Sequence, residues 1–235
     1  SAIINCGAYT AVDKAESEVA LAEAINALAP GKLAAAAAKA GIAIVHVSTD
    51  YVFPADGTGP WREDAATGFT AGRARNLGAR AAREAGADYI VFMDGDCVPA
   101  AHFVAAHRAL AERGCFVNGS RVLLSERLSK QVCEGLDPLQ VPTGRWLQWR
   151  LRGDVNKLAH LMPWPGMPRR LERSFRWSGI RSCNFGLWWA DLAAVNGFDE
   201  TFSGWGHEDA DLVLRLHNQG LVRKNGHLAT EVFHL

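Results

Sequence analysis

The stretch Asp88-Tyr-Ile-Val-Phe-Met-Asp-Gly-Asp-Cys-Val-Pro99 decides the fold that this sequence predicts. Its five apolar or aromatic residues, Tyr89 to Met93, are typical of a strand that is buried on both faces. Asp94 and Asp96 follow, and two side chains that far apart in an extended segment point to the same side. Paired carboxylates at the end of a buried strand suit Mg²⁺ or Mn²⁺ shared with a diphosphate. For an Asp-x-Asp pair alone, the alternative is a solvated turn.

The composition is that of an ordinary globular protein. The 235 residues are enough for one α/β domain or two small ones, and 49% of them are hydrophobic. Lys plus Arg and Asp plus Glu both number 25, so no net charge attracts nucleic acid. The five cysteines form no C-x-x-C pair, which favours reduced thiols in a cytoplasmic protein. No apolar run approaches the roughly 18 residues that span a bilayer.

The first third of the chain predicts a parallel βαβ unit. Ala2 to Asn5 and Ile42 to Val47 are strand candidates. The alanine-rich segment between them, residues 14–40, predicts two helices that meet at Pro30-Gly31, because proline lacks the amide proton and glycine tolerates cap geometry. Residues 54–67 are rich in Pro, Gly, Asp and Thr and predict a loop. Two strands joined by helices form a parallel pair.

Three motifs in this third carry a family resemblance. They are Asn5-Cys-Gly-Ala-Tyr-Thr-Ala-Val-Asp-Lys-Ala-Glu16, Val47-Ser-Thr-Asp-Tyr-Val-Phe53 and Gly59-Pro-Trp-Arg-Glu-Asp64. Over residues 1–66 the chain resembles the dTDP-4-dehydrorhamnose reductases, a resemblance that implies a catalytic role for Thr49. However, no Gly-x-x-Gly-x-x-Gly turn precedes the first strand. Ala71 and Arg75 stand where the family has its Tyr-x-x-x-Lys pair, and neither can supply the proton chemistry. The sequence therefore predicts no reductase activity.

The remaining two thirds predict further alternating helices and strands. Helices are expected at residues 73–84, 101–113, 190–195 and from Gly204 to Gln219, and strands at residues 115–118, 181–189 and 229–235. The segment Gly204-Trp-Gly-His-Glu-Asp-Ala-Asp211 is the second strong motif. Its carboxylates lie in the first turn of a helix, where the helix dipole favours negative charge. An ordinary N-terminal capping cluster is the alternative.

Together these motifs resemble the GT-A glycosyltransferases, in particular family 2 and the galactosyltransferase group. The resemblance covers about residues 69–235 and rests on Ala74-Arg-Asn-x-Gly78, Phe92-Met-Asp-Gly-Asp-Cys97, Asn196-Gly-Phe-Asp-Glu200, Gly204 to Asp211 and Phe233-His-Leu235. It implies transfer of a sugar from a nucleotide-sugar to a hydroxyl group, with Mn²⁺ or Mg²⁺ as cofactor.

The resemblance also implies roles for single residues. Asp94, Asp96 and His234 would hold the metal, although a histidine near a terminus often has no special role. Arg75, Asn76, Asp94 and Asp96 would bind the donor, and Asp50, at the end of the second strand, would contact its nucleotide. Asp209 would be the catalytic base with Glu208 beside it, and Trp205 and Glu208 would bind the acceptor. A single base opposite the leaving group implies inversion at the anomeric carbon.

The sequence as a whole predicts a three-layer α/β fold of GT-A type with a mainly parallel sheet. We expect a reductase-like segment over residues 1–66 and a transferase region over residues 67–235, joined as a chimera. The expected function is a metal-dependent inverting glycosyltransferase of polysaccharide biosynthesis, using a UDP- or dTDP-sugar and a glycan or other hydroxyl acceptor. Alternatives are a reductase-like nucleotide-sugar oxidoreductase and a non-catalytic nucleotide- or glycan-binding remnant. The expected location is the cytoplasm, with peripheral membrane association left open.

Overall fold

The computed structural model describes residues 2–5, 20, 29–39, 43–46, 71–176, 178–202 and 207–235. The strands are β1 (Ala2–Asn5), β2 (Ala43–His46), β3 (Tyr89–Met93), β4 (Cys97–Pro99), β5 (Cys115–Asn118), β6 (Ser120–Leu123), β7 (Leu171–Glu172), β8 (Asn184–Trp188), β9 (Val222–Asn225) and β10 (Glu231–His234). The α-helices are α3 (Ala29–Lys39), α4 (Ala71–Glu84), α5 (Phe103–Leu110), α6 (Glu126–Cys133), α7 (Thr143–Arg152), α8 (Trp189–Ala194) and α9 (Glu208–Asn218). No helix within these ranges is long and apolar enough to cross a membrane.

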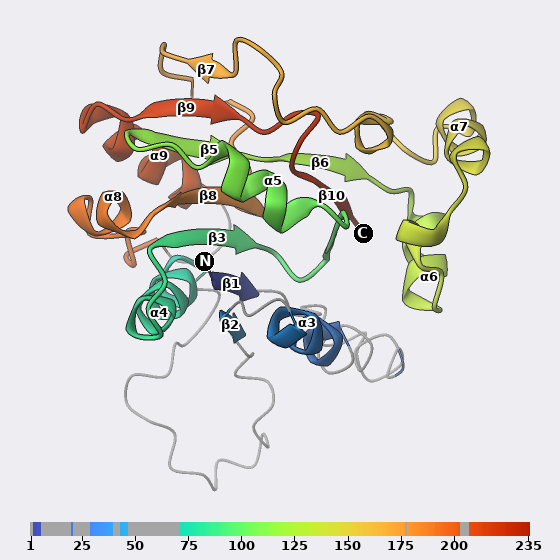
Figure 1. The fold of residues 1–235 in the computed structure, drawn as a ribbon, viewed down its shortest axis with the longest axis horizontal. Helices are drawn as coiled ribbons and strands as arrows, with labels where there is room; N and C mark the ends of the chain where they lie inside the picture. Colours follow the sequence, from blue (N-terminus) through green and yellow to red (C-terminus); the bar gives the residue numbers. More distant parts are fainter. Residues whose placement is uncertain are drawn as a thin grey trace, which may run out of the picture.

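The larger sheet has seven strands in the order β2-β1-β3-β8-β5-β9-β7 (Figure 1). The pairs β2–β1, β1–β3 and β5–β9 are parallel, whereas β8 is antiparallel to both neighbours and β7 is antiparallel to β9. Five strands therefore share one direction, and β8 and β7 oppose it. This confirms an α/β fold and the parallel pairing of the first two strands. The sheet is mixed rather than mainly parallel, because three of its six strand pairs are antiparallel.

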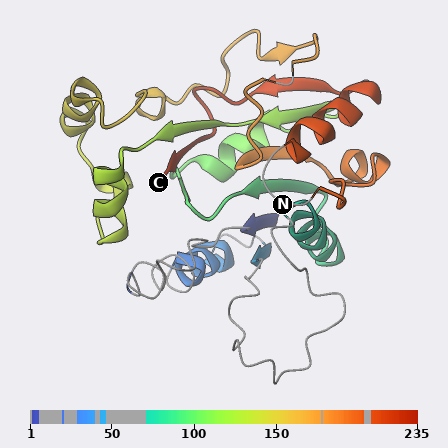
Figure 2. The ribbon, with the colours of Figure 1, turned by 180° about the vertical axis from the view of Figure 1, so that it is seen from behind.

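Helices cover both faces of this sheet. On one face α4, α8 and α9 pack against β3, β5 and β8. On the other face α5 packs against β3 and β5, and Leu33 of α3 joins the same apolar layer. Figure 2 shows α4 and α9 on the near side of the sheet, with α5 behind it. The three predicted layers are therefore present.

The strand that organises the fold is buried as predicted. Every side chain of β3 is buried, with Tyr89, Val91 and Met93 facing the α5 layer and Ile90 and Phe92 facing the α4 layer. This alternation follows from the two-residue period of a strand. Burial of both faces places β3 near the centre of the sheet, so the residues that follow it emerge at the middle of one edge.

A small second sheet with the order β4-β10-β6 lies beyond the carboxyl end of β3. In it β10 runs antiparallel to β4 and parallel to β6. An apolar cluster of α6, α7 and the small sheet lies around Trp146, Trp149 and Phe233. The sequence did not predict β4, β6, β7 or β9. Their short length and weak alternation explain why periodicity misses them.

Candidate active site

Asp96 and His234 meet where the two sheets adjoin. His234 Nε2 lies 3.3 Å from Asp96 Oδ2. The contact is fixed by the backbone, because β10 pairs His234 with Cys97 and the amide of Leu235 donates to the Asp96 carbonyl at 2.9 Å. The end of the chain is thus held against the turn that follows β3, and the structure brings together two of the three predicted metal ligands.

The electrostatics of this pair support a charged contact. Burial opposes ionisation of Asp96, but the hydrogen bond and the charge of His234 outweigh it and lower the pKa of the carboxyl. The hydrogen bond to Asp96 is in turn the main reason why the pKa of His234 is raised. The Asp96 side chain is still 46% exposed. A carboxylate and an imidazole therefore face solvent together.

A divalent cation fits this group of atoms. Ligand atoms of Asp96, Cys97 and His234 lie within 4.8 Å of one another. A hydrogen bond to the Cys183 sulfur, and then burial, hold the pKa of the Cys97 thiol well above its ordinary range, so Cys97 offers no thiolate. The remaining carboxylate oxygen and imidazole nitrogen suit Mn²⁺ or Mg²⁺ completed by substrate oxygens.

Asp94 points to a different partner. Its Oδ1 accepts from Arg75 Nη2 at 3.0 Å, and Arg75 Nη1 donates to Glu208 Oε1 at 3.2 Å. The Arg75 side chain is only 6% exposed and also lies over the Phe198 ring. Arg75 bonds to Asp94, just after β3, and to Glu208, at the start of α9. We therefore interpret it as a residue that holds these two carboxylates in place. This favours a positioning role for Arg75 and leaves the Asp94 metal contact a prediction.

Asp209 lies in the first turn of α9, next to Glu208. Burial, and then the negative charge of Glu208, raise the pKa of the Asp209 carboxyl above its ordinary value. Hydrogen bonds from the backbone at Ala210 and Ser182 and the charge of Arg75 act in the opposite direction. A carboxylate with a raised pKa is a better proton acceptor than an exposed one. The environment of Asp209 therefore suits the role that sequence predicts.

Asn76 is a buried link between α4 and the segment before the acidic helix. Its side-chain amide donates to the Phe198 carbonyl at 2.8 Å and to Glu200 Oε1 at 2.9 Å, and its Oδ1 accepts from the Phe198 amide at 2.8 Å. A side chain at Gly197, where φ is +70°, would bring Cβ within 2.3 Å of Asn76 Oδ1. These bonds favour a structural role over the donor contact that sequence predicted.

We expect Asn76→Ala to lower the free energy of unfolding by about 1–3 kcal/mol, because both buried backbone groups of Phe198 lose their partner. Denaturant unfolding measures this change, and Asn218→Ala, at an exposed position on α9, is the matched control. If Asn76→Ala leaves stability unchanged but weakens nucleotide binding, the donor-contact prediction is correct instead.

Two predicted site residues, Asp50 and Trp205, lie outside the described residues, as does Thr49. Their roles as nucleotide, acceptor and reductase residues stay predictions.

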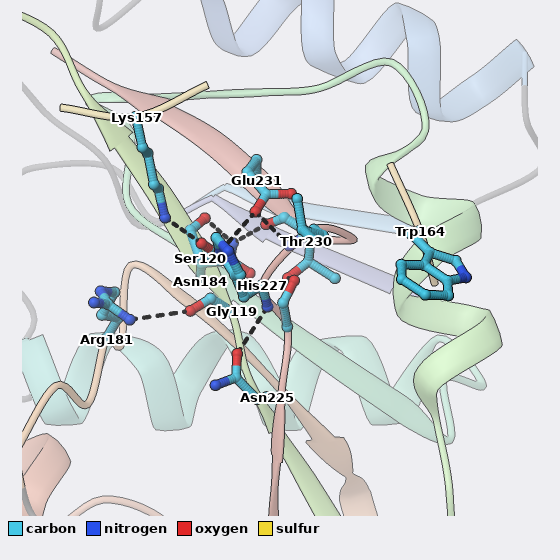
Figure 3. Close-up of polar contacts among 12 residues, drawn as sticks. Gly119, Ser120, Lys157, Trp164, Arg181, Asn184, Asn225, His227, Thr230 and Glu231 are labelled. Carbon is cyan, nitrogen blue, oxygen red and sulfur yellow. Dashed lines mark hydrogen bonds and ion pairs between the residues drawn. The ribbon is translucent and has the colours of Figure 1, made fainter. Parts of the chain in front are cut away.

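A buried amide that sequence reasoning missed supports the site. Asn184, at the start of β8, donates to the Ser120 carbonyl at 2.9 Å and to the Thr230 carbonyl (Figure 3). Its Oδ1 lies 2.9 Å from His107 Nε2. Burial lowers the pKa of His107 to about 4, so this histidine is neutral. The network ties β8 to β6 and β10 and fixes Cys183 beside the Asp96–His234 pair. An isolated Asn in an apolar strand was the only available signal.

Two family models match the chain in different places. Residues 1–93 match the RmlD substrate binding domain, and residues 169–231 match the N-terminal domain of galactosyltransferase. The chain thus has two segments that are similar to two different families. The first match ends at Met93, the last residue of β3, and the second contains Asn184 and Asp209. Both resemblances that sequence analysis stated are confirmed.

Curated relatives match the front of the chain. The dTDP-4-dehydrorhamnose reductase of Streptomyces griseus is 53% identical over 66 residues, which are 28% of this chain and 22% of that protein. The reductase of Escherichia coli K12 is 44% identical over 92 residues, 38% of this chain and 31% of that protein. The chain thus spans about a fifth to a third of the length of these relatives.

Two solved structures superpose on this chain at low sequence identity. One is the catalytic domain of Drosophila β1,4-galactosyltransferase 7 with xylobiose, at a TM-score of 0.45 and 12% identity over 99% of this chain and 69% of that one. The other is GalNAc-T7 with UDP, GalNAc and Mn²⁺, at a TM-score of 0.45 and 13% identity over 86% of this chain and 34% of that one.

Proposed function

We propose that this chain is a metal-dependent, inverting glycosyltransferase that moves a sugar from a UDP- or dTDP-sugar to a hydroxyl group of a glycan or similar acceptor. The observation that carries the proposal is the meeting of Asp96 and His234 at 3.3 Å. Arg75 joins the same strand end to the helix that bears Asp209. The galactosyltransferase match over residues 169–231 supports the assignment.

The proposed chemistry assigns one task to each group. Asp96 and His234 would hold a divalent cation, which supplies positive charge to the leaving diphosphate. Asp209 takes the proton of the acceptor hydroxyl while its oxygen bonds to the anomeric carbon. The bond from that carbon to the diphosphate oxygen breaks on the opposite side. A single base facing the leaving group therefore gives inversion.

Thermal stability with added ligands tests the proposal. UDP with Mn²⁺ at about 100 times its dissociation constant should stabilise the protein by roughly 2.7 kcal/mol. Transfer to a glycan acceptor from a UDP- or dTDP-sugar should then be detectable and require the metal. If neither UDP nor dTDP stabilises the protein in the presence of Mn²⁺, the proposal is contradicted. The alternative of a non-catalytic nucleotide- or glycan-binding remnant is then favoured.

The reductase reading is the second candidate, because residues 1–93 match the RmlD family. Ala71 and Arg75 stand at the positions of its Tyr-x-x-x-Lys pair, and Arg75 is held between Asp94 and Glu208. We therefore expect no stabilisation by NADPH and no NADPH oxidation with a dTDP-4-keto sugar, measured at 340 nm. A full-length dTDP-4-dehydrorhamnose reductase is the positive control. Hydride transfer by this chain would promote the reductase to first place.

Organisation and location stay proposals. We propose that the chain is a chimera whose reductase-like front, up to about residue 66, completes the sheet of a GT-A-type transferase in polysaccharide biosynthesis. Continuity of β1, β2 and β3 in one parallel sheet supports this. A cytoplasmic location is consistent with Cys97, Cys115, Cys133 and Cys183, which form no disulfide in the described part of the chain.

A further inference from the structure

Three half-buried cationic side chains lie near the start of β6, outside the Asp96–His234 pair. Lys157 Nζ donates to the Ser120 hydroxyl, and Arg181 Nη1 donates to the Gly119 carbonyl at 3.5 Å. Figure 3 shows both side chains approaching these two neighbouring residues. Arg121, the next residue of β6, leaves the strand on the opposite face from Ser120, and its charge acts on both Lys157 and Arg181. We call Arg121, Lys157 and Arg181 the β6 cation cluster.

The β6 cation cluster is poorly neutralised. Within the described ranges none of its three members forms an ion pair with a carboxylate. Burial lowers the pKa of Lys157, and the charges of Arg181 and Arg121 lower it further. The pKa of Arg181 is likewise lowered by burial and then by Arg121. Like charges brought together and partly desolvated are stabilised by an added anion.

A carboxylate that acts on Lys157 is already buried. Glu231 is fully buried, and its Oε1 accepts from the Leu228 amide at 2.8 Å. Its charge raises the pKa of Lys157, but it is not within ion-pair distance of the ammonium. Glu231 also faces His227 and the buried Arg170. Its single negative charge is therefore shared among Lys157, His227 and Arg170.

The backbone that carries the cluster is rigid. The Gly119 amide donates to the Asn184 carbonyl at 2.7 Å, and a Cβ at Gly119 would lie 2.0 Å from the Asn184 side chain. Asn184 in turn binds the Ser120 and Thr230 carbonyls. The Ser120 residue that Lys157 contacts and the Gly119 carbonyl that Arg181 contacts therefore belong to backbone that Asn184 holds by hydrogen bonds.

The cluster borders the Asp96–His234 pair without coinciding with it. The charge of Arg121 acts on both His234 and Cys183. In the parallel register, however, His234 lies opposite Leu123, whereas Ser120 lies opposite Glu231. Leu123 lies three positions after Ser120 in β6, which is about 10 Å along the strand. Ser120, which Lys157 contacts, and Leu123, which lies beside His234, are therefore on different stretches of β6.

We propose that the β6 cation cluster binds an anionic group carried by a sugar, so that the glycan substrate is an acidic one, bearing a carboxylate or a phosphate. Guanidinium and ammonium groups with a neighbouring hydroxyl suit the oxygens of such a group. That the bound sugar is a substrate rests on the proposed function. The binding of the anion does not, because it requires neither metal nor transfer.

The test is calorimetric titration of the full chain in excess chelator with glucuronate and with glucose 6-phosphate, each compared with glucose. Both acidic sugars should bind at least about tenfold more tightly than glucose, a difference of about 1.4 kcal/mol. Lys157→Gln should lower the affinity for both acidic sugars by at least about tenfold, and Arg181→Gln should have the same effect. Binding should weaken as salt rises.

Lys130→Gln is the matched control, because Lys130 is 77% exposed on α6 and pairs only with Glu134. Lys157→Gln is the primary variant, since its head group contacts one hydroxyl and its loss leaves the backbone network intact. Equal affinity for glucose and the acidic sugars would overturn the proposal, as would full affinity in folded Lys157→Gln. Binding of pyrophosphate or UDP with no detectable binding of either acidic sugar would also overturn it. Transfer activity without this preference would leave the proposed function standing.

Discussion

Asp96→Ala is expected to abolish the metal-dependent binding of UDP. The Asp96 oxygen is the hard ligand atom of the pair, and His234 alone is a weak site for Mn²⁺ or Mg²⁺. Loss of a residue that only supports a ligand already costs 10–100-fold in metal affinity, so loss of the ligand should cost about 100-fold or more. Titration of UDP with and without Mn²⁺ measures the effect.

Two aspartates near the same strand are controls for Asp96→Ala. Asp88, which precedes β3 and pairs with Arg83 on the surface, should tolerate Ala with unchanged binding. Asp94→Ala distinguishes a role of Asp94 as a metal ligand from a role as the partner of Arg75. If its main partner is Arg75, the variant should lose stability and keep the metal response. UDP binding by the wild type that is equal in excess chelator would show that the metal assignment is wrong.

The sequence predicted those parts of the fold that depend on local pattern. β3 was predicted because a run of five apolar side chains is typical of a strand that is buried on both faces of a sheet. Asp94 and Asp96 were placed at its end for the same reason. Helix α4 was predicted from residue 73 and begins at Ala71. Pro30-Gly31 lies at the start of α3, where a proline without an amide proton is tolerated.

Long-range contacts account for what the sequence did not predict. Nothing local indicates that Arg75 binds both Asp94 and Glu208, since the second partner is 133 residues away. The residues next to Asn76 in the sequence do not show whether its side chain contacts the donor or bonds to the backbone of Phe198. Many arginines lie between residues 145 and 181, but only the contacts of Lys157 with Ser120 and of Arg181 with Gly119 show which cations lie near β6. Those pairings depend on tertiary packing.

Asp209→Asn is expected to lower the rate of transfer by about 10²- to 10⁴-fold, which is the usual contribution of a general base. Asparagine keeps the size of the side chain but cannot take the acceptor proton. Binding of UDP with Mn²⁺ should stay unchanged, because Asp209 lies on α9 and is not one of the ligand atoms around Asp96. Asp96→Ala should lose binding and rate together. Single-turnover transfer and UDP titration on both variants give the comparison.

The acidity of Asp209 adds a second, independent observable. Since burial and the charge of Glu208 raise its pKa, the base is protonated first as the pH falls, and wild-type transfer should decline through that raised pKa. The decline should be absent in the residual activity of Asp209→Asn. A capping role alone would predict otherwise: a loss of roughly 1 kcal/mol of stability, with turnover per folded molecule unchanged. Normal turnover with an unaltered pH profile in Asp209→Asn would remove this carboxylate from the mechanism and leave Glu208, already paired with Arg75, as the nearest acid in the same turn.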